Sequence, residues 1–386
     1  MTQPRQQLIV QITARSPLAF AERKPGAQFR ESLPYVPGAA IFGALGQYLA
    51  EEGRFDEAFL RRIRCHNAYP AQYGDAWVRP LPLTALQPKG KSDGPLIDAL
   101  VERVCWERQQ PPALIYLPTD DDGRPWELPD WRFYTLLAGV PQKRRISQRV
   151  LTRVAINRQR GTAEDQRLYS PLVLTETSSF LGSIAFDPAD MALVAELVPH
   201  IRYLGGRQST GLGKVEVKPY ARQDKATEPP ISERIEQLTS RFQQQAARYH
   251  EWGGGEWTIP ARSLFTINLL SDAILLEHGW LPTQEFSADM LEELTGIKAT
   301  LRRSFTRTLT IGGWAALWQQ PKATSLAVGM GSLYLFEAAQ PLSAAECTRL
   351  EDLQLSGIGT RRQEGFGQVR VCDAFHLLEP SGGKGE

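Results

Sequence analysis

The sequence lacks the features that mark several classes of protein. Four of its 386 residues are cysteines, and no two of them stand at C-x-x-C spacing, so it predicts neither a zinc site nor a redox pair. No apolar run approaches the roughly 20 residues that a membrane-spanning helix needs, and the first residues lack the apolar segment of a signal peptide. We therefore expect a cytoplasmic protein that binds no membrane, metal or cofactor.

An excess of charge of either sign is also missing. The formal net charge is +1, so bulk charge does not predict a nucleic-acid partner. The kind of cation is more informative, because 34 arginines stand against 10 lysines. The planar arginine side chain grips phosphate through two hydrogen bonds and stacks on bases. A GC-rich genome also enriches arginine, so the distribution of the arginines has to decide between the two explanations.

One segment, residues 143–167, has a clear local excess of positive charge. It holds eight cations against two acids, Glu164 and Asp165. This composition predicts contacts with phosphate, although a solvated charged face would look the same. The candidate RNA-binding residues of the segment are Lys143, Arg144, Arg145, Arg149 and Arg158.

Periodicity in the first half of the chain predicts mixed helix and sheet. Residues 7–18 alternate as a strand, and residues 38–50 place their apolar side chains on one face of a helix. The turn into this helix exposes backbone N–H groups at Gly38, a natural anion site, although such a turn usually only joins a strand to a helix. Further expected elements are strands over 170–187 and 214–217, a helix over 188–198, and loop-rich insertions over 66–98 and 118–130.

The second half repeats this mixture after a polar linker at 221–230. A helix is expected from the N-cap Ser232 to about His250, and another over 343–353 with Ser343 as its N-cap. Strands are expected at 264–270, 305–311, 324–336 and 368–371. The expected organisation is a first domain at 1–220 with insertions, a linker and helix at 221–256, a second domain at 257–378 and a disordered tail at 379–386.

Two Gly-rich stretches share the pattern G-x-R-x-x-x-G-Φ-G-x-V-x-V at a constant offset, where Φ is apolar. Six fixed residue types recur, each copy following a helix and preceding a strand, which indicates two related α+β units. Bare backbone N–H groups beside an arginine suit the backbone of a polyanion, although a Gly-rich turn also lets a strand join its sheet. The candidate RNA-binding residues are Gly205, Gly206, Arg207, Gln208, Ser209, Gly211, Gly213 and Lys214, and in the second copy Arg361, Arg362, Gly365 and Gly367.

Four features of the sequence resemble the RAMP superfamily of CRISPR-associated proteins. They are residues 16–18 followed by the helix start at 35–45, the segment 154–170, the pair of Gly-rich loops, and the segment 312–334. The resemblance implies an α+β fold of two ferredoxin-like (RRM-like) domains with loop insertions, each ending in a Gly-rich loop and a strand. Two departures stand out: Asn157 replaces an aspartate and Phe42 an arginine found in many relatives.

Two RAMP units in one chain look most like the handle-capping subunit of type III-D effector complexes. This resemblance implies a ribonucleoprotein subunit that binds the five-prime handle of the guide RNA (crRNA) and serves assembly in antiviral defence, not cutting. It also implies contacts with the large polymerase-like subunit and with backbone RAMP subunits, and target RNA as a further partner.

Two other functions stay open from the sequence. One is a RAMP endoribonuclease, with His66 processing guide RNA or Asp121 cutting target RNA, although a packing histidine and a turn aspartate explain both residues. The other is a protein-binding scaffold using Trp280, Leu281, Trp314 and Trp318, residues that a core would also contain. The loop at 84–98 is a candidate for a thumb-like protrusion.

Overall fold

The computed structural model describes residues 4–20, 29–30, 32–91, 94–112, 114–120, 122–157, 162–220, 228–315 and 320–378. Within these ranges the side chains of residues 29, 30, 154–157, 162–169, 314, 315 and 321 are not described. No helix in this part of the chain combines the length and apolar character needed to cross a membrane. Mixed helix and sheet confirm the predicted α+β class.

The first unit is built on an antiparallel sheet in the order β15-β1-β14-β3, with β4 also paired to β14. Alternating side chains of its central strand are buried, because one face of the sheet packs against helices. The strands are β15 (Val215–Pro219), β1 (Gln6–Ala14), β14 (Ser179–Phe186), β3 (Arg64–Cys65) and β4 (Tyr69–Pro70). The helices are α1 (Gly38–Glu51), α2 (Glu57–Arg62) and α4 (Met191–Leu197), with the 3-10 turns η1 (Pro188–Asp190) and η2 (Val198–His200) flanking α4.

The second unit has an antiparallel sheet in the order β19-β24-β16-β25. These strands are β19 (Ala299–Phe305), β24 (Leu333–Ala338), β16 (Leu264–Leu269) and β25 (Val369–Val371). The helices are α5 (Ile231–Glu251), α6 (Ala288–Thr295) and α7 (Ala344–Ser356). A further helix, α3 (Leu100–Gln109), packs against α5 and joins this hydrophobic core although it lies far earlier in the chain. The predicted domain boundaries stay a prediction.

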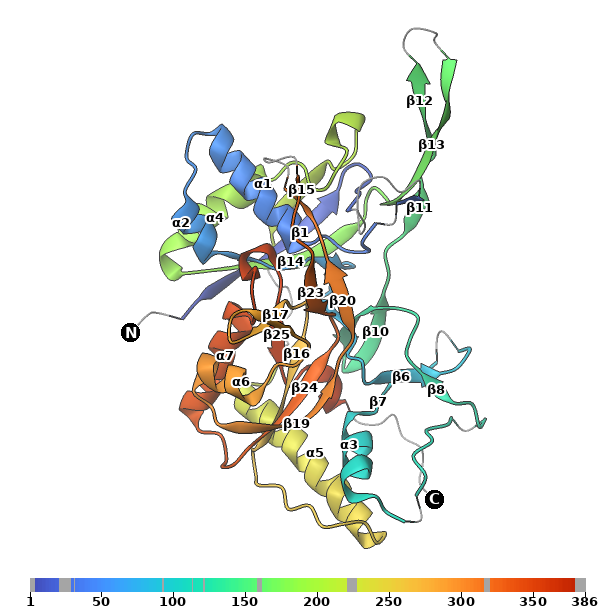
Figure 1. The fold of residues 1–386 in the computed structure, drawn as a ribbon, viewed down its shortest axis with the longest axis vertical. Helices are drawn as coiled ribbons and strands as arrows, with labels where there is room; N and C mark the ends of the chain where they lie inside the picture. The colour runs from blue at the N-terminus through green and yellow to red at the C-terminus, as the bar shows by residue number, and fades with distance from the viewer. Residues whose placement is uncertain are drawn as a thin grey trace.

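In both sheets the first strand of the unit, β1 or β16, lies in the centre. On one side it pairs with the last strand, β15 or β25, and on the other with the third strand, β14 or β24. This is the order that a β-α-β-β-α-β unit gives when both helices cover one face. The ferredoxin-like assignment itself stays a prediction. Figure 1 shows the two units stacked, with blue α1 in the upper one and red α7 in the lower one.

Several small sheets extend this frame. A long hairpin of β12 (Arg153–Asn157) and β13 (Thr162–Leu174) projects away from the body of the molecule (Figure 1). Around it lie β2 (Phe29–Arg30) and β11 (Gln148–Val150), both paired to β13. In the second unit the hairpins are β17 (Leu275–Glu277) with β18 (Leu281–Thr283), β20 (Thr308–Ile311) with β23 (Ser325–Val328), and β21 (Trp314–Ala315) with β22 (Gln320–Pro321).

The stretches predicted as loop insertions contain short paired strands. One sheet joins β10 (Val140–Arg144), β9 (Phe133–Leu137) and β5 (Arg79–Pro80), and another joins β7 (Ile97–Asp98), β6 (Ala85–Pro88) and β8 (Trp126–Glu127). The loop at 84–98, a candidate protrusion, therefore supplies two strands of a small sheet.

Three expectations for single elements were wrong. Ser232 lies inside α5, and the N-cap is Pro230, which makes no side-chain capping bond. The expected strand at 324–336 is two strands, because the chain turns at Gly331, where φ is +84°. The expected helix at 188–198 is α-helical only over α4, between the 3-10 turns η1 and η2. The predicted N-cap Ser343 is confirmed, and it forms a capping box with Glu346.

Candidate nucleic-acid interface

The two Gly-rich stretches fold into the same backbone. We call residues 204–214 loop one and residues 358–368 loop two. Arg207 and Arg361 both adopt the left-handed conformation, with φ of +63° and +54°. Gly211 and Gly365 match as well, at +86° and +90°, and each loop contains a single 3-10 turn, η3 (Gln208–Thr210) or η4 (Arg362–Glu364). The repeat in sequence is therefore a repeat in structure.

Each loop is held by the segment that follows the first strand of its unit. The N–H of Gly213 donates to the carbonyl oxygen of Pro17 at 2.9 Å, and the N–H of Gly367 donates to the backbone carbonyl oxygen of Asp272 at 2.8 Å. Two serine hydroxyls add a matched pair of acceptors at 2.9 Å, Ser16 for the N–H of Lys214 and Ser271 for that of Gln368. These bonds occupy the N–H groups at the end of each loop, so the glycines there serve the fold.

Loop two is docked against the first unit. Gly365 is buried, and a Cβ atom there would stand 2.6 Å from the carbonyl oxygen of Cys65 and 3.0 Å from the Cα of Gly38. The N–H of Gly38 donates to Oδ1 of Asn67 at 2.8 Å. The prediction that this N–H is an open anion site was wrong, because a side chain and loop two already fill the space at the start of α1.

The positive charge of Arg361 is neutralised within loop two. Its Nη2 lies 2.7 Å from Oε2 of Glu364, which also accepts from Nζ of Lys322 at 2.8 Å. The guanidinium lies over the ring of Phe366, 4.7 Å from its centroid. Burial alone would raise the pKa of Glu364, but the hydrogen bonds from Arg361 and Lys322 bring it below the usual range.

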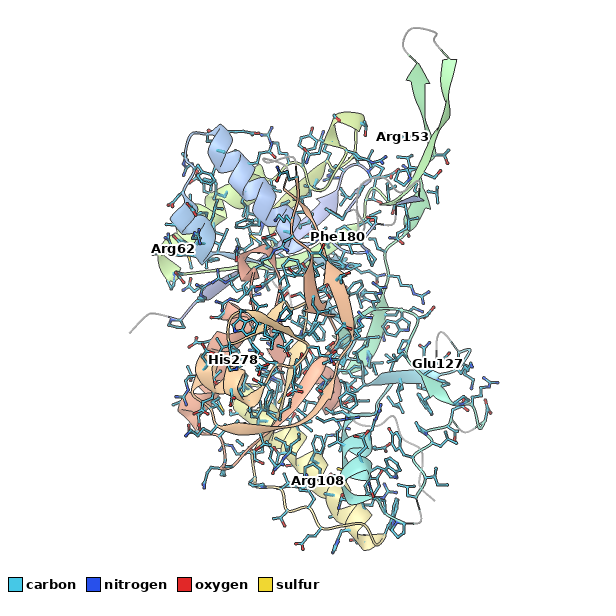
Figure 2. All side chains as sticks on the ribbon, viewed as in Figure 1. Arg62, Arg108, Glu127, Arg153, Phe180 and His278 are labelled. Atoms are coloured by element: carbon cyan, nitrogen blue, oxygen red, sulfur yellow. The ribbon has the colours of Figure 1, made fainter. Side chains whose placement is uncertain are left out.

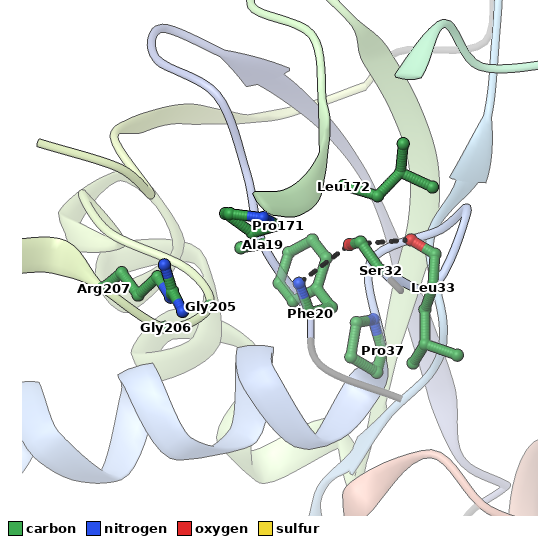
Figure 3. A pocket seen from close by; sticks show the side chains of 10 residues that line it. All are labelled: Ala19, Phe20, Ser32, Leu33, Pro37, Pro171, Leu172, Gly205, Gly206 and Arg207. Carbon is green, nitrogen blue, oxygen red and sulfur yellow. Dashed lines mark hydrogen bonds between the residues drawn. The ribbon is translucent and has the colours of Figure 1, made fainter. Parts of the chain in front are cut away.

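Loop one is open where loop two is covered. Residues 208–211 are exposed, and Arg207 is half-buried. Beside the loop lies a hollow of about 400 Å³, with Gly205, Gly206 and Arg207 on one side and Leu33 and Leu172 on the opposite side (Figure 3). The remaining lining residues are Ala19, Phe20, Ser32, Pro37 and Pro171. An apolar hollow with an arginine at its side can hold a flat, unstacked base and an attached phosphate.

The hairpin β12–β13 is tied to loop one at its base. Nη1 of Arg153 donates to the carbonyl oxygen of Thr210 at 3.1 Å. Figure 2 labels Arg153 at the lower end of this hairpin. Loop one, the hollow and the hairpin base therefore form one continuous surface.

Much of the predicted basic segment is paired with acids from elsewhere in the chain. Arg144 is buried in a salt bridge to Asp75, with nitrogen–oxygen distances of 2.5 and 2.7 Å, so it serves the core and is not open to RNA. The exposed cations are paired too, Arg145 with Asp130 at 2.7 Å and Arg149 with Glu176 at 3.1 Å. Lys143 lies 5.4 Å above the Trp131 ring, and Arg158 lies outside the described residues.

His66, the first candidate for catalysis, does not stand in an open site. His66 is 4% exposed, and its Nδ1 lies 2.9 Å from Oγ of Ser183. Burial lowers the pKa of His66 to about 4, and the charges of Arg64 and Arg5 act in the same direction. A histidine in this position does not reach an RNA substrate. Asp121 lies outside the described residues.

Residues 242–372 match the family CRISPR-associated protein (Cas_Cmr3). The match runs from within α5 through the second unit to the end of loop two and β25. It confirms the predicted likeness to CRISPR-associated RAMP-type proteins, while the narrower likeness to type III-D subunits stays a prediction.

Solved structures give a weaker likeness. Chains from the cryo-EM structures of the Type III-B Cmr-beta bound to cognate target RNA, with and without AMPPnP, are 12% and 13% identical. Both alignments cover 85% of this chain and 86% of the other, with TM-scores of 0.41 and 0.40. A chain from the apo Cmr-beta structure is 13% identical over 55% of this chain and 96% of its own, with a TM-score of 0.31. No curated protein matches the chain.

Sequence reasoning missed several residues of this surface. Phe20 and Pro171 line the hollow, Arg153 holds loop one, and Asn67 caps the start of α1. None of them belongs to the repeated pattern. Arg153 lies in the basic segment 143–167, and the positive charge of that segment was the local signal that could have found it. Of the candidate scaffold residues, Trp280 is 72% exposed and Leu281 is exposed as well, against the expectation of a core position. The Trp314 side chain and Trp318 lie outside the described part of the chain.

Proposed function

We propose that the chain is a non-catalytic subunit of a type III CRISPR ribonucleoprotein and that it holds the five-prime handle of the guide RNA at loop one. The observation that carries the proposal is the contrast between the two loops. Loop one has the same backbone as loop two, but it contains no acid and borders an open apolar hollow. The Cas_Cmr3 match supports the CRISPR setting.

The chemistry of the surface suits single-stranded RNA. The half-buried side chains of Leu33, Pro37 and Leu172 offer apolar surface for one unstacked base, and Arg207 lines the same hollow. Sequence-specific RNA recognition relies on such splayed-out bases, held by stacking and by hydrogen bonds along their edges. In this proposal Arg207 binds a phosphate beside the base, and backbone groups of loop one contact the ribose.

The remaining partners follow from the same proposal. The large polymerase-like subunit and a backbone RAMP subunit contact the chain, target RNA passes nearby, and the complex works in the cytoplasm. The exposed Trp280 and Leu281, on the β17–β18 hairpin, supply an apolar area for a protein neighbour.

Direct binding of labelled guide RNA to the purified chain tests the proposal. We expect Arg207→Ala to weaken binding about tenfold or more, because a lost arginine–phosphate contact costs roughly 1–3 kcal/mol. Arg349→Ala is the matched control, since Arg349 is an exposed arginine on α7, far from loop one in the chain.

RNA with a scrambled handle and the integrity of the RNA complete the test. Handle-dependent binding that Arg207→Ala removes supports the proposal. Equal affinity for the scrambled handle contradicts handle recognition, and RNA that is cut by the purified chain contradicts the non-catalytic role.

A further inference from the structure

Three arginines converge at the seam between the two units, away from loop one. Arg5 precedes β1, Arg64 begins β3, and Arg362 lies in η4 of loop two, which packs against α1, α2 and β3. The Nη1 atoms of Arg5 and Arg64 donate to the same acceptor, the carbonyl oxygen of Arg62, at 2.8 and 3.2 Å. Figure 2 labels Arg62, which marks the place.

The charges of these three side chains are poorly balanced. Within the part of the chain that the structure describes, Arg64 and Arg362 form no salt bridge, and Arg5 has one, to Asp187 at 3.5 Å. The other nearby acid, Asp190, is already paired with Arg62 at 2.9 Å. Nε of Arg64 is buried and has no hydrogen-bond partner among the described residues. Such a group is costly to leave unsatisfied.

The electrostatic potential around these arginines is positive, which is seen in the lowered pKa values of Arg64 and Arg362. Burial lowers the pKa of Arg64 to about 10, with Arg5 and Arg362 contributing in the same direction. Burial also lowers the pKa of Arg362, again with a contribution from Arg5. The charged forms of Arg64 and Arg362 are therefore disfavoured by neighbouring guanidinium groups, and a nearby anion would relieve that repulsion.

Helix capping explains only part of the cluster. Nη1 of Arg64 reaches the carbonyl oxygens of Arg61, Arg62 and Ile63, where α2 ends, at 2.7, 3.2 and 2.9 Å. One arginine satisfies these groups, as basic residues commonly do at helix ends. Arg362, from the other unit, donates in a similar way to the carbonyl oxygen of Gly357, the C-cap residue of α7, at 3.3 Å. These contacts still leave Nε of Arg64 without a partner among the described residues.

We propose that Arg5, Arg64 and Arg362 form a phosphate-binding site that spans the seam between the two units. The three side chains are partly exposed, so a phosphate group can approach from solvent. Carbonyl oxygens fix the planes of the guanidinium groups, and planar, oriented guanidiniums suit bidentate contact with phosphate oxygens. The phosphate belongs either to an RNA backbone or to a free phosphate compound.

Thermal unfolding of the full chain tests the site without RNA. The melting temperature Tm is measured in inorganic phosphate and in chloride or acetate of equal ionic strength. Because phosphate stabilises folded proteins in general, the comparison between variants decides. We expect a phosphate-specific rise in Tm for the natural chain, its loss in Arg362→Gln, and its retention in Arg54→Gln, a control that removes an exposed arginine paired with Glu196.

Two further readouts keep the test decisive. In chloride, Arg362→Gln should melt no earlier than the natural chain, because it removes a repelling charge, and Arg64→Lys should keep the fold while losing most of the phosphate effect. The proposal is overturned if phosphate acts no differently from acetate, or if Arg362→Gln responds to phosphate as the natural chain does.

An RNA titration then identifies the source of the phosphate. If RNA supplies it, Arg362→Gln binds guide RNA more weakly, inorganic phosphate competes with RNA, and the slope of log affinity against log salt falls by about 0.7–0.9. If the source is free phosphate, the variant keeps its RNA affinity while its phosphate response is gone. Arg207→Ala, measured in parallel, reports on loop one separately.

Discussion

Loop one and loop two have one backbone and two environments. In both, the arginine at the start of the 3-10 turn is left-handed and the closing glycine donates to the segment after the first strand. The two loops differ in charge, because Thr210 corresponds to Glu364 and Gln208 corresponds to Arg362. They also differ in their neighbours, because loop two faces Gly38 and Cys65 while loop one faces a hollow. The shared glycines therefore indicate a shared backbone. The different charges and neighbouring residues indicate that the two loops have different roles.

The largest expected effect comes from adding one methyl group to each loop. Gly365→Ala and Gly211→Ala carry the same left-handed strain of roughly 1–2 kcal/mol. Only Gly365 has protein against it, with the Cys65 oxygen 2.6 Å from the new Cβ, while no described atom lies within 4 Å at Gly211. We expect Gly365→Ala to lower the free energy of unfolding by a further 1–3 kcal/mol or so, as overpacking does, measured by denaturant unfolding.

The outcome decides how firmly loop two is docked. Equal losses in the two variants would contradict the contrast between a docked loop and an open one. A larger loss for Gly365→Ala, with the RNA affinity of the folded fraction unchanged, would assign loop two to the joint between the units.

Placing the acid of loop two at the matching position of loop one should have a smaller effect, which is on RNA binding. Thr210→Glu places a carboxylate three residues after Arg207, as Glu364 stands three residues after Arg361. The new carboxylate would compete with RNA phosphates for Arg207 and would also repel them. We expect guide RNA to bind several-fold more weakly, since a half-exposed pair contributes about 0.2–1 kcal/mol.

Thr210→Val is the matched control for this change. It removes the hydroxyl, which donates to the carbonyl oxygen of Arg207 at 2.9 Å, without adding charge. Unchanged affinity in Thr210→Glu would show that RNA does not depend on the charge of Arg207 and would weaken the proposal for loop one.

The contrast also shows how far the sequence alone could lead. It predicted the α+β class, the main strand and helix of the first unit, and the repeated loop, because periodicity and glycine spacing are local signals. It could not tell which copy of the loop is covered. That depends on Gly38 and Asn67, which lie some 300 residues from loop two in the chain.

The basic segment shows the same limit for charge. A count of charges within residues 143–167 finds few acids to balance Arg144, Arg145 and Arg149. In the folded chain these arginines form salt bridges with Asp75, Asp130 and Glu176, respectively, which lie outside that segment. Local charge counts hold for extended segments and fail where a sheet brings distant acids alongside. Pairing of this kind therefore leaves the predicted role of the segment in RNA binding a prediction.

The smallest expected effect is a pH dependence that belongs to loop two alone. The pKa of Glu364 is lowered in the folded chain, so its pairing stabilises the fold fully above the unfolded value of about 4.5 and is lost as pH falls below that value. Glu364→Gln should therefore cost about 1 kcal/mol at neutral pH, and the difference from the natural chain should shrink toward pH 4, as measured by Tm across this range. Loop one has no acid to titrate, so Thr210→Val should leave the pH profile of the natural chain unchanged. A difference between Glu364→Gln and the natural chain that stays constant down to pH 4 would mean that Arg361 and Lys322 do not hold the carboxylate of Glu364 in its charged form.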